Sequence, residues 1–445
     1  MSEALDEPVA DPSDSARSAP SSRPPAWVVL VVALVAVRVV AIVLLLGSGI
    51  EDEHSILGGD ARRYEVILDS EGTPYRDFEV EYPPVTLVLI HVLGGGDGVV
   101  EEVSFDDNLR MLTRLAVLQL GFELGTAALL GWAWNRRTAV AYLVLGTPFI
   151  FFPFPYARID LFTVFLTVIG LAMVRKGFDR AGGVGVAVAA LAKLWPLVVA
   201  PLLVVLRRPR AVGPWLLTFG IGVAGWLALF GPSGLAQVAT FRGSDGWQIE
   251  SLVGIFFHMA DQGASRVEQG AWRTGVPVPL LVKPLLPALA LATTGLAWWW
   301  AHLRRTRDEV NDEWATWATA PLASVLGLLV FSTIISPQYI LWFAPFVAVL
   351  AARGERLLSA LYLMVAALTT FIIGTIHGQI EGELYATLPI VVRNGLLVAM
   401  LAIAMWRLSP WSSVNPADTE AADDRPGAGS SAPQHQSQSL WRNHR

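Results

Sequence analysis

Apolar runs long enough to cross a membrane recur along this chain from end to end. They constrain its fold more than any other feature. A helix needs about 20 mostly apolar residues to cross the hydrocarbon layer, and 53% of the 445 residues are hydrophobic while 16% are charged. Backbone polar groups in lipid must be satisfied internally, so these runs predict helices. We therefore expect an all-α polytopic integral membrane protein with about 10–12 transmembrane helices.

Hydropathy divides the chain into one membrane domain with a tail at each end. Residues 26–408 form the predicted transmembrane domain, while 1–25 and 409–445 are low in complexity and are expected to be disordered. The first run has no small-residue cleavage site after it, which favours a retained span over a signal peptide. The predicted spans are 27–47, 109–134, 138–154, 159–175, 213–231, 279–301, 314–331, 338–353, 356–377 and 386–407.

Basic clusters predict the topology, because Arg and Lys accumulate in cytoplasmic loops. Placing every cluster inside puts both termini in the cytoplasm and leaves two large outer loops, 48–108 and 231–278. The first outer loop carries fifteen Asp or Glu against three Arg, which agrees with an extracytoplasmic location. The clusters are Arg136-Arg137, Arg175-Lys176 with Arg180, Arg207-Arg208-Arg210, Arg304-Arg305-Arg307 and Arg353-Arg356.

Two apolar segments do not fit a simple crossing. Residues 182–206 lie between two basic clusters, so they must enter and return, and a hairpin broken near Lys193-Leu194-Trp195-Pro196 fits that path. Residues 85–93 are too short to span and predict an interfacial or re-entrant helix inside the first outer loop. A pair of short true crossings remains open for that region. In the first span, Arg38 is costly near the midplane and is expected to pair with an acid such as Glu123.

Polar residues that the topology leaves at the membrane edge all fall on the outer face. Ionisable groups against hydrocarbon are expensive and usually functional, so one outward-facing polar cavity is the economical prediction. Motifs for phosphate-binding loops, zinc proteases and serine hydrolases are absent from the sequence, as are cysteines. The candidate residues are Asp60, Arg62, Arg63, Arg158, Asp160, Lys193, Arg242, Gln248, Glu250, Ser336, Gln338, Tyr339 and His377.

This arrangement resembles the GT-C superfamily of membrane glycosyltransferases, and in particular glycosyltransferase family 87, the polyprenyl-phosphomannose-dependent α-mannosyltransferases. The resemblance covers about residues 27 to 407. Its motifs are Gly59-Asp60 with Tyr64, Pro74-Tyr75 leading to Glu81-Tyr82-Pro83-Pro84, Arg158-Ile159-Asp160, Lys193-Leu194-Trp195-Pro196, Arg242 with Gln248-Ile249-Glu250-Ser251, and Ser336-Pro337-Gln338-Tyr339.

The resemblance implies a GT-C-like helical bundle and an inverting transfer from an outer-leaflet polyprenyl-phosphate sugar. With it, we expect Asp60 as the catalytic base. We expect Arg158, Lys193, Arg242 and His377 on the donor phosphate. Asp160, Gln248, Glu250, Gln338, Tyr339 and Trp195 are expected on the sugar or the acceptor.

The expected function is hexose transfer, with mannose favoured, onto a glycolipid or glycan of the cell envelope, at the extracytoplasmic face of a bacterial plasma membrane. Asp60 stands alone rather than in a paired acidic motif, which favours a mechanism without metal or other cofactor, although Glu51-Asp52-Glu53 is a rival acidic site. Asp261 to Gly275 matches no motif and is a candidate for acceptor choice. The alternatives are a flippase or transporter of lipid-linked sugars and an arabinofuranosyltransferase of the same superfamily.

Overall fold

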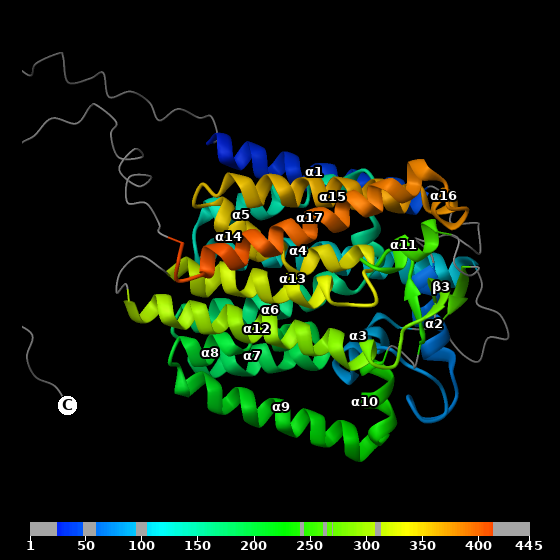
Figure 1. Cartoon of the computed structure of the whole chain (residues 1–445), viewed down its shortest axis with the longest axis horizontal. Helices are drawn as coiled ribbons and strands as arrows, with labels where there is room; N and C mark the ends of the chain where they lie inside the picture. Colours follow the sequence, from blue (N-terminus) through cyan, green and yellow to red (C-terminus); the bar gives the residue numbers. More distant parts are fainter. Residues whose placement is uncertain are drawn as a thin grey trace, which may run out of the picture.

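The computed structural model describes residues 25–47, 59–94, 105–240, 244–260, 265–268, 270–307 and 313–412. The predicted tails at 1–25 and 409–445, the acidic run at 51–53 and Arg242 lie wholly or largely outside these residues. Long helices run side by side across the described part and form one bundle (Figure 1). A small sheet and several short helices close one end of the bundle.

The first half of the described chain is helical throughout, with short 3-10 turns where prolines fall. Its elements are α1 Ala26–Gly47, α2 Gly59–Asp69, α3 Pro84–Leu93, α4 Phe105–Ala133, α5 Arg136–Leu145, η2 Thr147–Ile150, η3 Phe154–Ala157, α6 Asp160–Arg175, α7 Asp179–Ala192, η4 Trp195–Val198, α8 Pro201–Val205 and α9 Pro209–Phe230.

The second half adds the sheet and the remaining helices. Its elements are α10 Pro232–Ala239, β1 Gly246–Gln248, α11 Gly254–Met259, β2 Arg266–Glu268, β3 Ala271–Pro277, α12 Val282–Arg307, the π-helical turn η5 Ala315–Thr319, α13 Ala320–Val330, η6 Pro337–Trp342, α14 Ala344–Ala351, α15 Arg356–Gly374, α16 Ile376–Ile380 and α17 Leu384–Leu408.

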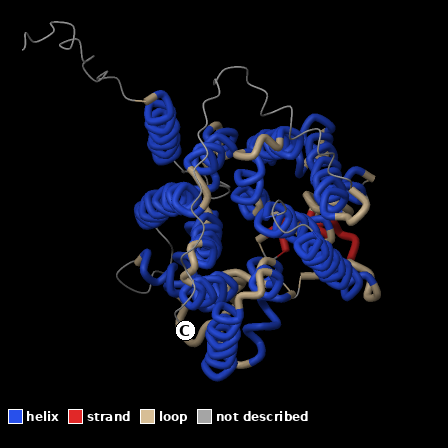
Figure 2. Tube along the Cα trace, turned by 90° about the vertical axis from the view of Figure 1, so that its left-hand side faces the viewer, coloured by secondary structure: helices blue, strands red, loops and turns tan. Residues whose placement is uncertain are grey.

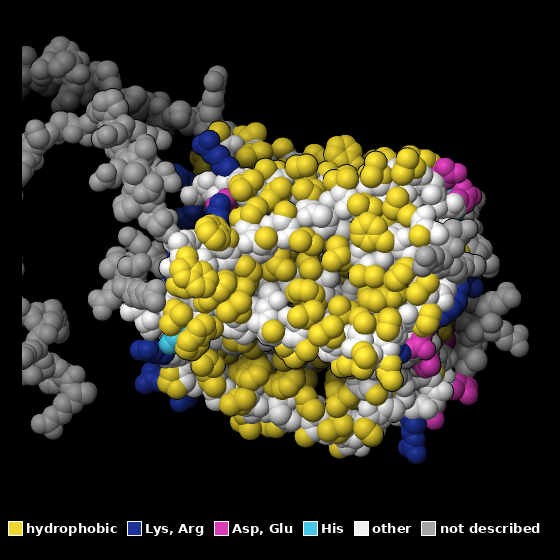
Figure 3. All heavy atoms as spheres, viewed as in Figure 1, with side chains coloured by type: hydrophobic (Ala, Val, Ile, Leu, Met, Phe, Trp, Pro, Cys, Tyr) yellow, Lys and Arg dark blue, Asp and Glu magenta, His cyan; other side chains and the backbone are white. Residues whose placement is uncertain are grey.

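The surface of the bundle is apolar around its middle and charged at its ends, as expected for a membrane protein. Figure 3 shows this apolar band, with most Lys and Arg at one end and most Asp and Glu at the other. Five described helices are long and apolar enough to cross a membrane, and they are α1, α4, α9, α15 and α17. The multi-pass helical class predicted from the sequence is confirmed.

Several predicted spans are shorter or broken. The span predicted over 138–154 is not a single helix: α5 ends at Leu145, and only the 3-10 turns η2 and η3 follow. Prolines explain the break, because they remove backbone donors and clash with the preceding turn. Similarly, the segment predicted over 338–353 consists of η6 followed by the eight-residue helix α14.

The predicted break in 182–206 is confirmed. Helix α7 ends at Ala192, Lys193 is in extended conformation, and η4 and α8 follow in short pieces. The segment predicted as interfacial or re-entrant is α3, only ten residues long, and Thr86 Oγ1 donates to Ala192 O at 2.6 Å. This bond fastens α3 to the point where α7 stops.

The second predicted outer loop folds into α10, α11 and a three-stranded antiparallel sheet in the order β1-β3-β2. This sheet was not predicted. It lies at the right-hand end of the bundle in Figure 1, and Figure 2 looks along the helices from the opposite end. The start of α1 and the end of α17 both lie at that opposite end of the bundle (Figure 1).

A buried ion pair ties the first span to the bundle. Arg38 of α1 is fully buried, and its Nε donates to Glu123 Oε1 of α4 at 2.9 Å, as the sequence predicted. Tyr156 Oη of η3 donates to the other carboxylate oxygen at 2.6 Å. A buried charge is tolerated only when it is paired and hydrogen-bonded. The pair therefore holds η3, and the residues just after it, against α1 and α4.

Candidate active site

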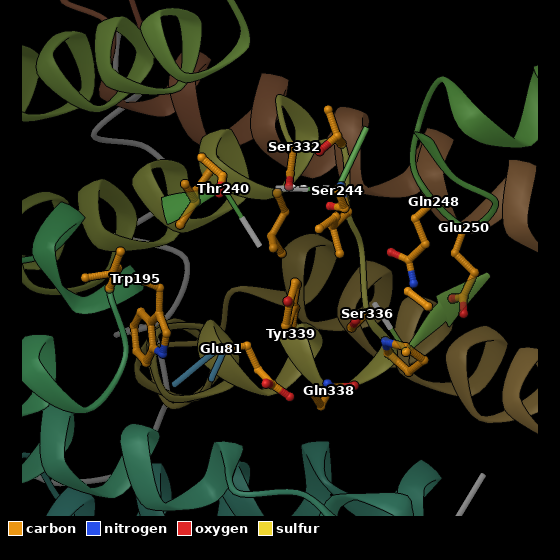
Figure 4. Close-up of a pocket in the computed structure, with 18 of the residues that line it drawn as sticks. Glu81, Trp195, Thr240, Ser244, Gln248, Glu250, Ser332, Ser336, Gln338 and Tyr339 are labelled. Carbon is orange, nitrogen blue, oxygen red and sulfur yellow. Dashed lines mark hydrogen bonds between the residues drawn. The ribbon is translucent and has the colours of Figure 1, made fainter. Parts of the chain in front are cut away.

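A cavity of about 1090 Å³ opens at the end of the bundle that carries the sheet. Residues from α2, the turn before α3, η4, β1, α12, η6 and the helix ends around them line it, and Figure 4 shows how they surround it. The cavity brings together eight of the residues that were given a role from the sequence, and the candidates Arg63 and Ser336 line it as well. The eight are Asp60, Arg158, Lys193, Trp195, Gln248, Glu250, Gln338 and Tyr339.

Asp60 and Arg158 form an ion pair in the wall of the cavity. Asp60 lies in the first turn of α2, where the helix dipole favours a carboxylate. Arg158 follows η3 and is held by the turn that Tyr156 anchors. Burial lowers the pKa of Arg158 to about 10, so its guanidinium stays protonated at neutral pH. Both side chains remain partly accessible, at 24% and 15%, and can meet a ligand.

Lys193 forms a second ion pair close by. Its Nζ lies 2.7 Å from Asp160 Oδ1, and Trp342 Nε1 donates to the same oxygen at 2.6 Å. Asp160 is 1% exposed and does not line the cavity, so the structure places it behind the wall rather than in contact with a sugar. Its geometry fits a different task, which is to orient Lys193.

Three aromatic rings form a stack beside Lys193. The ring of Trp342 lies 5.6 Å from that of Trp195, nearly parallel to it, and 4.0 Å from that of Tyr339. Lys193 Nζ lies 5.1 Å from the centre of the Trp342 ring, within reach of a cation–π interaction. Trp342 carried no predicted role. The only sequence signal for it was its place in the aromatic segment that follows Pro337 and also contains Tyr339.

Glu250 lies in the cavity wall and is held from behind. It is 5% exposed, and Arg393 Nη1 of α17 donates to its Oε2 at 2.8 Å. Arg393 Nη2 also donates to the Glu250 carbonyl at 2.8 Å, and the guanidinium contacts Asn394 Oδ1. Burial raises the pKa of Glu250 and Arg393 works against that rise. The sequence reasoning missed Arg393, although an arginine inside an apolar run was a signal for it.

Gln248 joins the sheet to the turn before η6. Its Oε1 accepts from the Ile335 backbone at 2.7 Å, and its own N–H donates to Thr333 O at 3.1 Å. Ser336, which ends this turn, is in extended conformation, as residues before a proline prefer. Gln338 and Tyr339 follow at the start of η6 and line the cavity (Figure 4).

A further ion pair at the cavity edge was not assigned from the sequence. Arg63 of α2 lies 3.0 Å from Glu81 and also donates to Glu79 O at 2.9 Å. Glu81 and Tyr82 line the cavity. The pair closes the segment between α2 and α3 onto the helix that carries Asp60.

Two predicted phosphate ligands are not placed in the cavity. His377 is exposed on the short helix α16 and is not among the lining residues, while Arg242 lies outside the described residues. Within the described ranges, no group of three or more His, Cys, Asp or Glu side chains is arranged to hold a metal ion. Each of the four carboxylates that line the cavity lies close to a cation instead: Asp60, Glu81 and Glu250 to arginines, and Asp245 to Lys283.

The sequence model of glycosyltransferase family 87 matches residues 81–333, which is 253 of the 445 residues. The chain belongs to glycosyltransferase family 87. The matched region contains Arg158, Lys193, Gln248 and Glu250, while Asp60 precedes it. The expected family is thereby confirmed, and this member is a membrane glycosyltransferase with a multi-pass helical fold.

Comparison with solved structures finds the crystal structure of ArnT from Cupriavidus metallidurans bound to undecaprenyl phosphate. The two chains are 16% identical, with a TM-score of 0.35, over 89% of this chain and 81% of that one. No curated protein matches the chain.

Proposed function

We propose that this glycosyltransferase moves a hexose, mannose, from a polyprenyl-phosphate sugar to a cell-envelope glycolipid or glycan. One observation carries the proposal: a carboxylate, Asp60, and two oriented cations, Arg158 and Lys193, share one cavity at the edge of a membrane-spanning bundle. Transfer from a sugar phosphate needs a base and cations for the leaving phosphate. The cavity holds both kinds of group. We place its mouth on the extracytoplasmic side.

Asp60 is the proposed general base. It takes the proton of the acceptor hydroxyl while that oxygen attacks C1 of the donor sugar, and the bond from C1 to the phosphate oxygen breaks. The anomeric configuration inverts because attack and departure are on opposite faces. The neighbouring Arg158 forms an ion pair with Asp60, and the carboxylate is the form in which a base accepts a proton.

Arg158 and Lys193 are the proposed ligands of the leaving phosphate. Negative charge develops on the phosphate oxygens as the bond to C1 breaks, and preorganised cations lower the barrier most when they need not reorient. Asp160 holds Lys193 at 2.7 Å, and η3 holds Arg158, so both are preorganised. An arginine can also grip two phosphate oxygens at once.

The remaining walls suit the two ends of the donor. The stack of Trp195, Trp342 and Tyr339 offers an apolar face for a sugar ring, with the Gln338 amide beside it. Another wall, from α10, α12 and α13, is almost wholly apolar and suits the first units of a prenyl chain. Its residues include Val238, Leu286, Ala290, Leu328, Leu329 and Phe331.

The test of the base is Asp60→Asn in purified protein with polyprenyl-phosphomannose and a glycolipid acceptor. Loss of a general base should slow transfer about a hundredfold to ten-thousandfold. The matched control is Glu71→Gln, an exposed acid of the same outer segment outside the cavity lining, which should transfer at the wild-type rate. An undiminished rate in Asp60→Asn would refute the assignment. Turnover of a polyprenyl-phosphate arabinose in place of the mannose donor would refute the proposed sugar.

A further inference from the structure

A second recess lies at the end of the bundle opposite the cavity. It is a cleft of about 340 Å³ where the ends of α4, α6 and α12 meet the turn before α9 and the start of η5. Four basic side chains and one acid line it, together with Ala133, Leu206 and Trp317. The charged residues are Arg175, Lys176, Arg208, Arg305 and Glu313.

The lengths of two helices give the distance between this basic cleft and the active-site cavity. Helix α6 begins at Asp160 behind the cavity and ends at Arg175 in the cleft, so it separates the two by about 22 Å. Helix α12 carries Lys283 at the cavity and Arg305 at the cleft, about 33 Å apart along the helix. The basic cleft is therefore not part of the glycosyl-transfer site.

One side of the basic cleft is rigid. Arg175 Nε donates to Ala133 O at 3.0 Å, and its guanidinium lies 5.2 Å and 5.4 Å from the ring centres of Trp134 and Trp317. The same guanidinium pairs with Glu313. These contacts use Arg175 to build the wall. Glu313 is the only acid among the lining residues, and Arg175 is its partner.

The other cations keep their charge available. Lys176 and Arg305 are exposed, and neither has a carboxylate partner among the residues that the structure describes. Arg208 lies 3.6 Å from Asp179, a loose pair with an exposed guanidinium. Like charges gathered around one recess repel each other unless an anion lies among them. Three cations directed at one recess therefore indicate an anion site.

The position of the basic cleft indicates which kind of anion. Trp132, beside the cleft, is 47% exposed, and Lys176 Nζ lies 5.5 Å from its ring centre. Exposed tryptophans near the ends of spans are typical of the level of lipid headgroups, and basic pockets between helix ends are typical sites for phospholipid headgroups. We propose that the basic cleft binds the phosphate of an anionic phospholipid headgroup, through Lys176, Arg208 and Arg305.

The test measures lipid binding by the full-length protein rather than transfer. The purified chain is reconstituted in phosphatidylcholine nanodiscs with and without phosphatidylglycerol, and phosphatidylglycerol retention is followed by native mass spectrometry. The variant is Lys176→Gln with Arg305→Gln. A hydrogen bond from a cation to a bound phosphate contributes about a tenfold gain in affinity, so the loss of both cations should weaken binding about a hundredfold.

The matched control removes the same charge at the same end of the bundle. Arg136→Gln with Arg137→Gln changes two exposed arginines of α5 that do not line the basic cleft, and it should retain phosphatidylglycerol like the wild type. Equal loss in both double variants would mean nonspecific surface charge and would overturn the proposal. Inorganic phosphate that competes as strongly as the lipid would overturn the lipid assignment in favour of a soluble phosphate compound.

Discussion

Single residues in the cavity follow one electrostatic rule. Of the four lining carboxylates, Asp60, Glu81 and Glu250 lie close to arginine side chains and Asp245 pairs with Lys283. Lys193 pairs with the buried Asp160. An unpaired charge at the edge of the hydrocarbon is costly, so each pair offsets part of the cost of placing its two members there. A substrate that approaches therefore meets charges whose positions are already fixed.

Glu250 provides a test of this rule. Burial raises the pKa of its carboxyl group and Arg393 opposes the rise, so removing the cation should raise that pKa further. A carboxylate is lost as the pH falls through its pKa, so the acid limb of the transfer rate should move to higher pH in Arg393→Gln. The measurement is the pH profile of kcat/KM.

Arg393→Lys is the control because it keeps the charge, and it should leave the acid limb closer to that of the wild type. Thermal unfolding of both variants shows whether the loss of a buried partner also affects stability. An acid limb at the same pH in Arg393→Gln and wild type would mean that Glu250 does not titrate in the reaction.

The same rule explains which pairs were predictable. Arg38 was expected to pair with Glu123 because a midplane arginine requires an acid, and the structure confirms the pair at 2.9 Å. Arg393 also lies inside an apolar run and also requires an acid, but no partner was predicted for it. Its partner Glu250 lies 143 residues away in a loop, however, and no spacing in the sequence identifies it.

Among the helices, close packing is decided by small residues. Gly170 lies at the contact of α6 with α7, and Gly183 at the contact of α7 with α9, where an added Cβ would meet Ala211 O at 2.1 Å. Tight backbone approach through glycine is typical of membrane helix pairs. These contacts hold α7, whose end carries Lys193, against the rest of the bundle.

Gly183→Ala should therefore separate α7 from α9. Overpacking costs about 1–3 kcal/mol, which lowers the thermal unfolding midpoint in detergent. Gly220→Ala in α9 is the matched control, because nothing lies within 4 Å of its Cβ position, and alanine favours a helix. A midpoint for Gly183→Ala equal to that of Gly220→Ala would contradict the packing argument.

Other features of the elements depended on proline and on tertiary pairing. The break at Lys193 was predicted because Pro196 stands inside an apolar run, whereas the prolines after Leu145 were overlooked as helix breakers. The sheet could not be predicted from the alternation of polar and apolar residues, because β1 has only three residues. It pairs with β3 through Gln248 and Arg273. Strands this short are specified by their partners rather than by their own sequence.

For the molecule as a whole, we propose that the charge asymmetry between the two ends of the bundle sets its orientation, with the cavity on the extracytoplasmic side (Figure 3). The chain has no cysteine, so introduced thiols are unique. Glu71→Cys, near the cavity end, should react with an impermeant thiol reagent added to intact cells. Arg137→Cys, at the other end, should react only after lysis. The reverse pattern would place the cavity in the cytoplasm.

The sequence alone determined that this chain is a multi-pass helical membrane protein of glycosyltransferase family 87, with its polar residues gathered toward one face. The helical class and the polar face follow from run length and local charge, while the family rests on the resemblance of its motifs, which the family model confirms. Only the tertiary structure decided that Asp60 meets Arg158, that Asp160 supports Lys193 rather than lining the cavity, and that Arg393 holds Glu250. Such contacts join distant segments, and helix packing decides which of many possible partners meet.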